Sequence, residues 1–329
     1  MHTKFKAIRQ FLEDEKRVSK WMDQTIDDLA AGDVVIKSEY AAVNYKDARA
    51  VTGVGNVISK FPCIPGVEVS GTVVESNDSN FKPGDKVTVQ GGRQFGMSRD
   101  GAYSEYVRVP STWVGRLPDG INTFEVVAMG LAAYTSAVAV AELIKKIKPD
   151  DGPIIVTGAT GGCPSFAIDM LSSLGYFVVA STGKSTENDY LRSLGANKVI
   201  GRDEIAGGNK PLEEQRWAGA IDAVGGKPLD DILRSSKERA VVCAFGNASS
   251  EVLQTSIYPF ILRSVSLVGI NANHPVPSRG DTWERMRKGG DLYPKHLYDI
   301  AYTIAFSDLK AHCEKLINSG VRGRAVVAF

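Results

Sequence analysis

The stretch IIVTGATGGCPSFAIDML, residues 154–171, decides the fold. It opens as a short apolar run typical of a buried strand, turns at Gly158, Gly161 and Gly162, and continues as a helix-like segment. Glycines permit such a tight turn, and the N–H groups at a helix start attract phosphate. A further glycine is usual where Pro164 stands, but proline is well tolerated in a helix's first turn. We therefore predict an altered turn that still binds a dinucleotide.

The phosphates of that ligand are expected to contact backbone N–H groups of the turn. These belong to Thr160, Gly161, Gly162 and Cys163. A plain tight turn remains the alternative, but the surrounding pattern of predicted strands favours cofactor binding.

Apolar runs recur at regular spacing around this turn. They lie at 153–157, 177–181, 198–201, 219–226, 240–246 and 265–271. Helix-like segments separate them, so they predict a doubly wound parallel sheet with α/β architecture.

Residues before about 125 follow another pattern. Segments such as DVVIKSEYAAVN (33–44) and VEVSGTVVES (67–76) alternate β-branched residues and are bordered by turn formers, which predicts a mostly antiparallel sheet or partial barrel. The final GRAVVAF (323–329) is expected to return a strand to this sheet. We predict a β-rich domain over 1–124, completed by about 275–329, and a dinucleotide-binding domain over 125–274.

The composition bounds the function. Thirty-nine basic and 38 acidic residues leave a net charge of +1, which favours a small-molecule partner over nucleic acid or a membrane surface. The four cysteines lie far apart, as expected for reduced thiols. MHTKFKAIRQFLEDEK (1–16) has no apolar leader pattern, and we expect no membrane span, hence a cytoplasmic protein.

The cofactor's identity is indicated by the end of the second apolar run. A sheet that prefers NAD places an acidic residue there for the ribose hydroxyls, whereas FVVASTGKSTENDY (177–190) has none at that point. Ser181, Thr182 and Lys184 offer hydroxyls and a cation for a 2′-phosphate, and Arg202 is a second cation. NADPH is therefore predicted, with a solvated loop as the alternative for these side chains.

NYKDARA (44–50), PCIPGVEVSGTV (62–73), STGKST (181–186) and YPFILRSVSLVGI (258–270) together resemble the medium-chain dehydrogenase/reductase superfamily. More narrowly, the chain resembles its zinc-free branch of acryloyl-CoA reductases and quinone oxidoreductases. The resemblance implies a GroES-like β domain, a Rossmann domain, and hydride transfer from NADPH to an activated double bond or a quinone.

The chain departs from the zinc alcohol dehydrogenases of this superfamily. They carry a cysteine near Asn44 and a histidine before the glutamate, where this chain has Gly66, Val67 and Glu68. We therefore expect no catalytic zinc. The branch itself usually has aspartate in place of Glu68 and glycine in place of Pro164.

Catalysis without zinc requires donors for the charge that develops on an oxygen. The resemblance places Asn44 and Tyr45 in that role: Asn44 would donate a hydrogen bond, and Tyr45 would orient the nicotinamide or donate a proton. The alternatives are a packed aromatic for Tyr45 and a helix cap for Asp47.

Turns at the ends of predicted strands are also expected to face the cofactor, and they contain Val224, Phe245, Gly246 and Asn247. The resemblance implies further cofactor contacts from Tyr45, Thr135, Asn318 and Arg324. A surface pair is the alternative for Asn318 and Arg324, and core packing is the alternative for Thr135.

Other functions stay open at this point. A crystallin-like protein that binds NADPH with little turnover, or a zinc-type alcohol dehydrogenase, would share most of these motifs. The family often joins Rossmann sheets edge to edge near VSLVGIN (265–271), so a homodimer is expected. Acryloyl-CoA, a quinone and a small enone all remain candidate acceptors.

Overall fold

The computed structural model describes residues 4–92, 94–273 and 280–329. The chain divides into two compact units, one of Met1–Leu131, Asn273–Asp281 and Ala301–Phe329, and one of Ala132–Ala272 and Thr282–Ile300. The boundary differs from the predicted one at residue 124, because it lies within helix α2 (Thr123–Ile144). Residues 282–300 also differ, since they pack with the second unit rather than the first.

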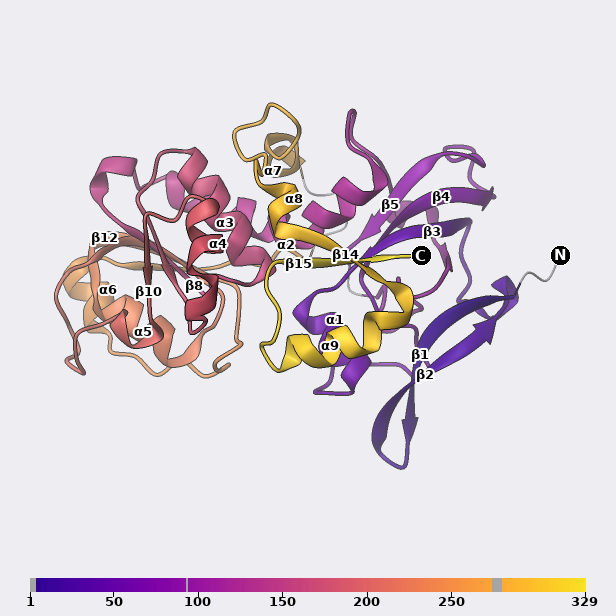
Figure 1. Ribbon diagram of the computed structural model, residues 1–329, viewed down its shortest axis with the longest axis horizontal. Coiled ribbons are helices and arrows are strands. Elements are labelled where there is room, and N and C mark those ends of the chain that lie inside the picture. Colours follow the sequence, from indigo (N-terminus) through magenta and orange to yellow (C-terminus); the bar gives the residue numbers. More distant parts are fainter. Residues whose placement is uncertain (1–3, 93, 274–279) are drawn as a thin grey trace. The chain divides into compact units, whose positions relative to one another are not determined.

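The first unit is built on a seven-stranded sheet, as shown in Figure 1. Its members are β3 (Val34–Ala42), β4 (Glu68–Ser76), β5 (Lys86–Gln90), β6 (Tyr106–Val109), β7 (Val114–Arg116), β14 (Ala301–Ala305) and β15 (Arg324–Ala328). The pairs from β3 to β7 are antiparallel, as predicted. Strand β15 pairs antiparallel with β3, which confirms that the C-terminal residues return to this sheet.

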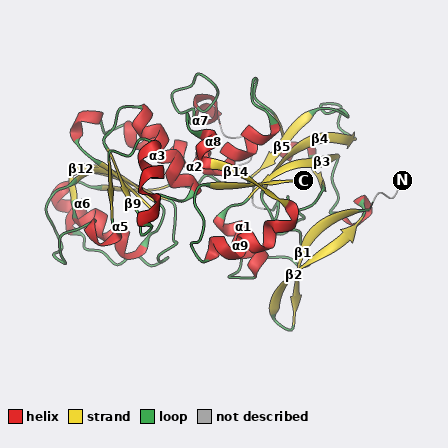
Figure 2. Cartoon of the chain, viewed as in Figure 1, coloured by secondary structure: helices red, strands yellow, loops and turns green. Residues whose placement is uncertain are grey.

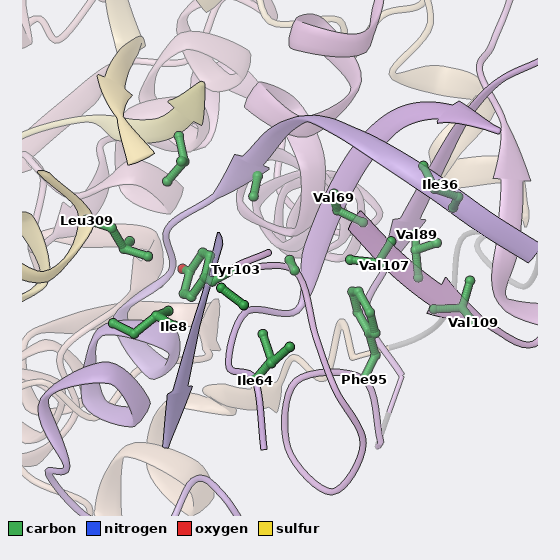
Figure 3. Close-up of a cluster of buried hydrophobic side chains, with 14 of the residues drawn as sticks. Ile8, Ile36, Ile64, Val69, Val89, Phe95, Tyr103, Val107, Val109 and Leu309 are labelled. Carbon is green, nitrogen blue, oxygen red and sulfur yellow. The ribbon is translucent and has the colours of Figure 1, made fainter. Parts of the chain in front are cut away.

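The core of the first unit is a cluster of buried aliphatic and aromatic side chains, drawn in part in Figure 3. Alternate residues of the strands supply most of it, because successive side chains of a strand point to opposite faces. Ile36, Val69 and Phe95 are each at most 1% exposed. Helices α1 (Tyr45–Thr52) and α9 (Leu309–Ile317) pack against each other, and β1 (Phe5–Glu13) forms a hairpin with β2 (Lys16–Gln24).

The second unit contains the predicted doubly wound sheet. Its strands lie in the order β10-β9-β8-β11-β12-β13, and every neighbouring pair is parallel. They are β8 (Ile154–Thr157), β9 (Val178–Ser181), β10 (Lys198–Ile200), β11 (Trp217–Asp222), β12 (Ser236–Ala244) and β13 (Ser266–Gly269). The central strands β8, β9 and β11 are buried along their whole length, which explains their unbroken apolar runs.

Helices alternate with these strands along the chain. Figure 2 shows the helices in red and the strands in yellow. The helices are α3 (Gly162–Ser173), α4 (Asn188–Ser193), α5 (Gly226–Arg234) and α6 (Tyr258–Arg263), followed by α7 (Gly280–Arg285) and α8 (Leu297–Ile300). Strand β13 lies at one edge of the sheet and alternates between half-buried and exposed residues.

Helix α2 bears on the expectation that the chain has no membrane span. The helix has 22 residues, and an 18-residue window within it has a mean hydropathy of 1.7, so by length and composition alone the helix is apolar enough to cross a membrane. The protein buries 78% of that window, as is common for core helices. The backbone breaks at Gly130, where φ is 39° and ψ is −142°.

Candidate cofactor and active site

The glycine turn of the second unit has the predicted form. Helix α3 begins at Gly162, and the residue before it, Gly161, provides no capping side chain. Gly158 adopts a φ of 59°, which only glycine tolerates readily. Pro164 is the third residue of α3 and is buried, so its missing N–H is one that has no acceptor within the helix. The predicted place of this proline in the first turn is confirmed.

The N–H groups of this turn differ in what they can bind. Gly161 donates its N–H to the carbonyl oxygen of Gly158 at 2.8 Å, so this group is committed to the turn, in contrast to the prediction. The N–H groups of Gly162 and Cys163 belong to the first two helical positions, which lack intrahelical acceptors. The helix start therefore offers its positive end to an anion without an acidic side chain in its first turn.

A buried pair behind the turn joins two strand ends. Thr157, at the end of β8, donates to Asp222 Oδ1 at 2.6 Å, and its hydroxyl accepts the Ala223 N–H at 3.1 Å. Asp222 Oδ2 accepts the Gly225 N–H at 2.8 Å. Burial raises the pKa of Asp222, while these hydrogen bonds lower it. We did not predict this pair, although an aspartate that ends an apolar run was a visible signal.

The pair places the loop that contains Val224 beside the glycine turn. A Cβ on Gly158 would lie 3.0 Å from Val224 Cγ1, so the two loops are in close contact. The loop of Phe245, Gly246 and Asn247 joins them, because Phe245 donates its N–H to the Asp222 carbonyl oxygen at 3.0 Å. These predicted cofactor residues are therefore brought together in the second unit.

The predicted 2′-phosphate residues also converge. Ser181 and Thr182 are buried, and Lys184 donates its backbone N–H to Thr182 Oγ1 at 3.0 Å. The guanidinium of Arg202 lies against Gly183, where an added Cβ would be 2.7 Å from Nε and 2.8 Å from Cζ. Burial lowers the pKa of Lys184, and the positive charge of Arg202 lowers it further. Two cations from different strand ends thus flank one glycine.

Two other predicted contacts of the cofactor lie on helices. Thr135 is half-buried in α2, next to Tyr134, whose ring packs edge-on against Trp283 with centroids 6.2 Å apart. Asn318 follows α9 in the first unit, is exposed, and donates from Nδ2 to the Glu314 carbonyl oxygen at 3.0 Å. The side-chain amide of Asn318 is therefore hydrogen-bonded to the last turn of α9.

The first unit places Asn44 and Tyr45 at the start of α1. Asn44 Nδ2 donates to Asp47 Oδ2 at 2.8 Å and to Glu68 Oε1 at 2.7 Å. Asn44 Oδ1 accepts from Arg324 Nη1 at 2.5 Å. Both amide hydrogens of Asn44 therefore already have acceptors, which argues against its predicted role as a donor to substrate. Tyr45 is 41% exposed, in contrast to the packed aromatic that was the alternative.

Asp47 is the helix cap that the alternative interpretation described. Its Oδ2 accepts the Asn44 backbone N–H at 3.0 Å as well as the side-chain amide. The side chain is only 1% exposed. Burial raises the pKa of Asp47 to about 6, with opposing contributions from Lys46 and the Asn44 hydrogen bonds.

Arg324 does not form the surface pair that was its alternative interpretation. Its Nη2 lies 2.6 Å from Glu68 Oε1, and the two side chains are 2% and 0% exposed, so the pair is internal rather than on the surface. Glu68 Oε2 also accepts the Leu131 N–H at 2.7 Å. An added Cβ on Gly130 would overlap the Glu68 carboxylate, which explains the glycine at this break in α2. No local signal predicted this arrangement.

The described residues offer no site for a metal ion. Within residues 4–92, 94–273 and 280–329, no group of three or more His, Cys, Asp or Glu side chains is arranged to hold a metal ion.

Comparisons with known proteins agree with this architecture. Residues 30–119 match the family described as the alcohol dehydrogenase GroES-like domain. Acrylyl-CoA reductase AcuI of Ruegeria pomeroyi is 40% identical over 92% of each chain. The Bacillus subtilis protein named "Putative quinone oxidoreductase YhfP" is 38% identical over 92% of each chain.

Solved structures give the same result. The yhdH oxidoreductase of Salmonella enterica, in complex with NADP, has a TM-score of 0.91 at 37% identity and covers 98% of this chain and 99% of its own. Bacillus subtilis yhfP with NAD bound has a TM-score of 0.92 at 36% identity, over 99% and 100% of the two chains. The present chain therefore belongs to the medium-chain dehydrogenase/reductase superfamily, in the branch of the acrylyl-CoA reductases and YhfP.

Proposed function

We propose that this protein is an NADPH-dependent reductase that transfers hydride to the activated double bond of an acryloyl-CoA-like thioester, or to a quinone, without zinc. The observation that carries the proposal is the convergence of Lys184 and Arg202 on Gly183, in the same unit as a helix start that has no acidic cap. Those cations suit a 2′-phosphate, and the helix start suits a pyrophosphate. The relatives named above support the reaction class.

The residues of this chain would bind and orient the reactants. NADPH, when bound, supplies the hydride. The N–H groups of Gly162 and Cys163 hold the pyrophosphate, and Ser181, Thr182 and the two cations hold the ribose phosphate. Tyr45 is exposed, and its hydroxyl is the group that donates a proton to the reduced acceptor, since Asn44 has no amide hydrogen left to give.

The cofactor assignment is tested by the two coenzymes. Lys184→Ala should weaken NADPH binding by about tenfold, the loss of one charge-assisted contact, and leave NADH binding nearly unchanged. Lys237→Ala is the matched control, because Lys237 lies at the start of β12 and bonds to the Asp151 carbonyl oxygen, whereas Lys184 and Arg202 follow the carboxyl ends of β9 and β10. Equal losses for both coenzymes, or better turnover with NADH in the parent protein, would refute the preference.

The acceptor is tested by NADPH consumption with acryloyl-CoA and with a simple quinone, side by side. Turnover with either supports the reductase. Normal NADPH binding with no turnover on any activated acceptor would favour the binding role without catalysis. Absence of NADPH binding would overturn the proposal altogether.

We also propose that the protein is a homodimer that acts on a small molecule, with no nucleic acid or membrane as partner. Strand β13 lies at one edge of its sheet, and exposed apolar side chains occur on β13 and on or next to α6, the helix that packs against the neighbouring strand β12. They are Ile257, Tyr258, Ile261, Leu262 and Leu267. An exposed apolar edge favours pairing with a second copy. Light scattering should give about twice the 35.4 kDa of one chain, and a mass of one chain at micromolar concentration would refute the dimer.

A further inference from the structure

The ion pair of Glu68 and Arg324 is directed at the start of α1. Arg324 donates from Nη2 to Glu68 Oε1 and from Nη1 to Asn44 Oδ1. Glu68 Oε1 accepts in turn from Asn44 Nδ2. The three side chains thus form a closed ring of charge-assisted hydrogen bonds, each 2.5–2.7 Å long.

This ring determines how Asn44 is oriented. Its amide oxygen faces the guanidinium, and its amide nitrogen faces the carboxylates of Glu68 and Asp47. The reverse orientation would place donors against Arg324 and an acceptor against two carboxylates, so it is strongly disfavoured. Asn44 is the residue that caps α1, and Tyr45 is the first residue of that helix.

The Tyr45 side chain has no comparable anchor of its own. Within the part of the chain that the structure describes, its hydroxyl has no hydrogen-bond partner, and its ring is 41% exposed. Its place therefore depends on the backbone of the first turn of α1, which the ring of side chains holds.

Stability alone is a weak reason for such a pair. Removing two charges from water costs free energy that their attraction repays only in part, so apolar residues of similar volume often serve equally well. The Glu68 carboxylate leaves space only for a glycine at position 130, and it accepts a hydrogen bond from the Leu131 N–H. The pair therefore bonds to α2 as well as to Asn44, but Asn44 is the only one of these partners that it contacts through both members by side-chain hydrogen bonds, and this points to a role in the geometry of the α1 start.

We propose that Glu68 and Arg324 are positioning residues for the reaction: through Asn44 they hold Tyr45 where its hydroxyl can donate a proton to the reduced acceptor. This inference rests on the proposed function, in which Tyr45 is the proton donor. Neither Glu68 nor Arg324 touches substrate or cofactor in this role.

The first test is a kinetic double-mutant cycle. Glu68→Gln keeps the shape but removes the charge, and we expect kcat to fall by about tenfold while the dissociation constant for NADPH changes by less than about twofold. In a Tyr45→Phe background, Glu68→Gln should cause almost no further loss, because the group it positions is gone. Additive losses in the cycle, or an unchanged kcat in folded Glu68→Gln, would overturn the inference.

Conservative replacement and a matched control separate positioning from stability. Arg324→Lys keeps the charge and should retain more of kcat than Arg324→Met. The control is Arg234→Lys, because Arg234 is also buried and pairs with Glu213, Asp230 and Asp231, but lies in the second unit. It should lower the unfolding midpoint without lowering kcat. A loss of kcat in Arg234→Lys as large as that in Arg324→Lys would show a general effect of stability.

A measurement independent of turnover completes the test. In fluorotyrosine-labelled protein, the fluorine resonance of Tyr45 is identified by its absence in Tyr45→Phe. Glu68→Gln should shift or broaden that resonance, whereas Arg234→Lys should leave it unchanged. An unmoved Tyr45 resonance in Glu68→Gln refutes the positioning role whatever the kinetics show. A moved resonance in a protein that reduces no acceptor refutes the proposed function and leaves the positioning of Tyr45 supported.

Discussion

Helices α1 and α3 begin in opposite ways. The first turn of α1 is closed by the protein itself: Asp47 accepts the Asn44 N–H, and the Asn44 side chain is held by Glu68 and Arg324. The first turn of α3 has no capping side chain, because Gly161 precedes it and no acidic residue lies in it. Both helices face the same physical problem, N–H groups without intrahelical acceptors.

The difference shows two uses of a helix start. In α1 the acceptors are internal carboxylates, so the start is rigid and displays the residue that follows the cap. In α3 the acceptors must come from outside, so the start remains open to an anionic ligand. The cap residue therefore distinguishes a helix start that is closed by the protein's own side chains from one that is left open to an anion.

The largest expected effect comes from closing α3. Gly161 has φ −76° and ψ 162°, which any residue adopts, and an added Cβ would meet its nearest neighbours at 3.3 and 3.5 Å. Gly161→Asp should cap the helix and repel the pyrophosphate, and we expect NADPH binding to weaken by roughly 2 kcal/mol, about thirtyfold. Fluorescence titration with NADPH measures it.

Gly161→Asn is the control for that experiment, because asparagine caps a helix as well as aspartate but carries no charge. It should weaken NADPH binding much less. If Gly161→Asp bound NADPH as tightly as the parent protein, α3 would not be the phosphate site.

A second, smaller effect tests the carboxylate that closes α1. The pKa of Asp47 is about 6 in the folded protein, compared with the ordinary aspartate value of 3.8 expected in the unfolded chain. The folded state therefore holds the proton more tightly. The stability that this contributes is present below about pH 4 and is lost as pH rises to about 6. From about pH 5 to about pH 7 the free energy of unfolding should fall by about 1 kcal/mol through this group.

Asp47→Asn retains an oxygen for the Asn44 N–H but cannot ionise, so it should lack this part of the pH dependence. Urea unfolding of the parent protein and of Asp47→Asn at the two pH values measures the change in the free energy of unfolding. All other titrating groups are the same in the two proteins, so the difference reports on Asp47. Identical pH dependence in the two proteins would contradict the raised pKa.

The smallest expected effect concerns Pro164. Replacing it by glycine restores an N–H at the third position of α3, and NADPH binding should tighten by at most about fivefold, or about 1 kcal/mol. Stability should fall slightly, because glycine frees the unfolded backbone. Pro164→Ala separates the two causes, since alanine restores the N–H without that cost. An unchanged dissociation constant in both would show that the proline costs no affinity.

Local patterns in the sequence determined much of this protein. The parallel sheet, the glycine turn, the place of Pro164 and the cap formed by Asp47 all follow from periodicity and from neighbours a few residues apart. The predicted NADPH residues Lys184 and Arg202 lie together because parallel strands present their carboxyl ends at one edge.

Only the tertiary structure decided what surrounds Asn44. Glu68 and Arg324 are separated by 256 positions in the chain. Gly130, from a third segment, leaves room for the pair, because any side chain there would overlap the Glu68 carboxylate. Periodicity and spacing describe which face of an element is buried, but not which buried charge meets which. The same limit explains why the sequence did not show that the Gly161 N–H is taken by Gly158, or that Thr157 joins Asp222. Such pairings depend on the three-dimensional approach of backbone and side chains, because a buried polar group must find a partner wherever the fold brings one.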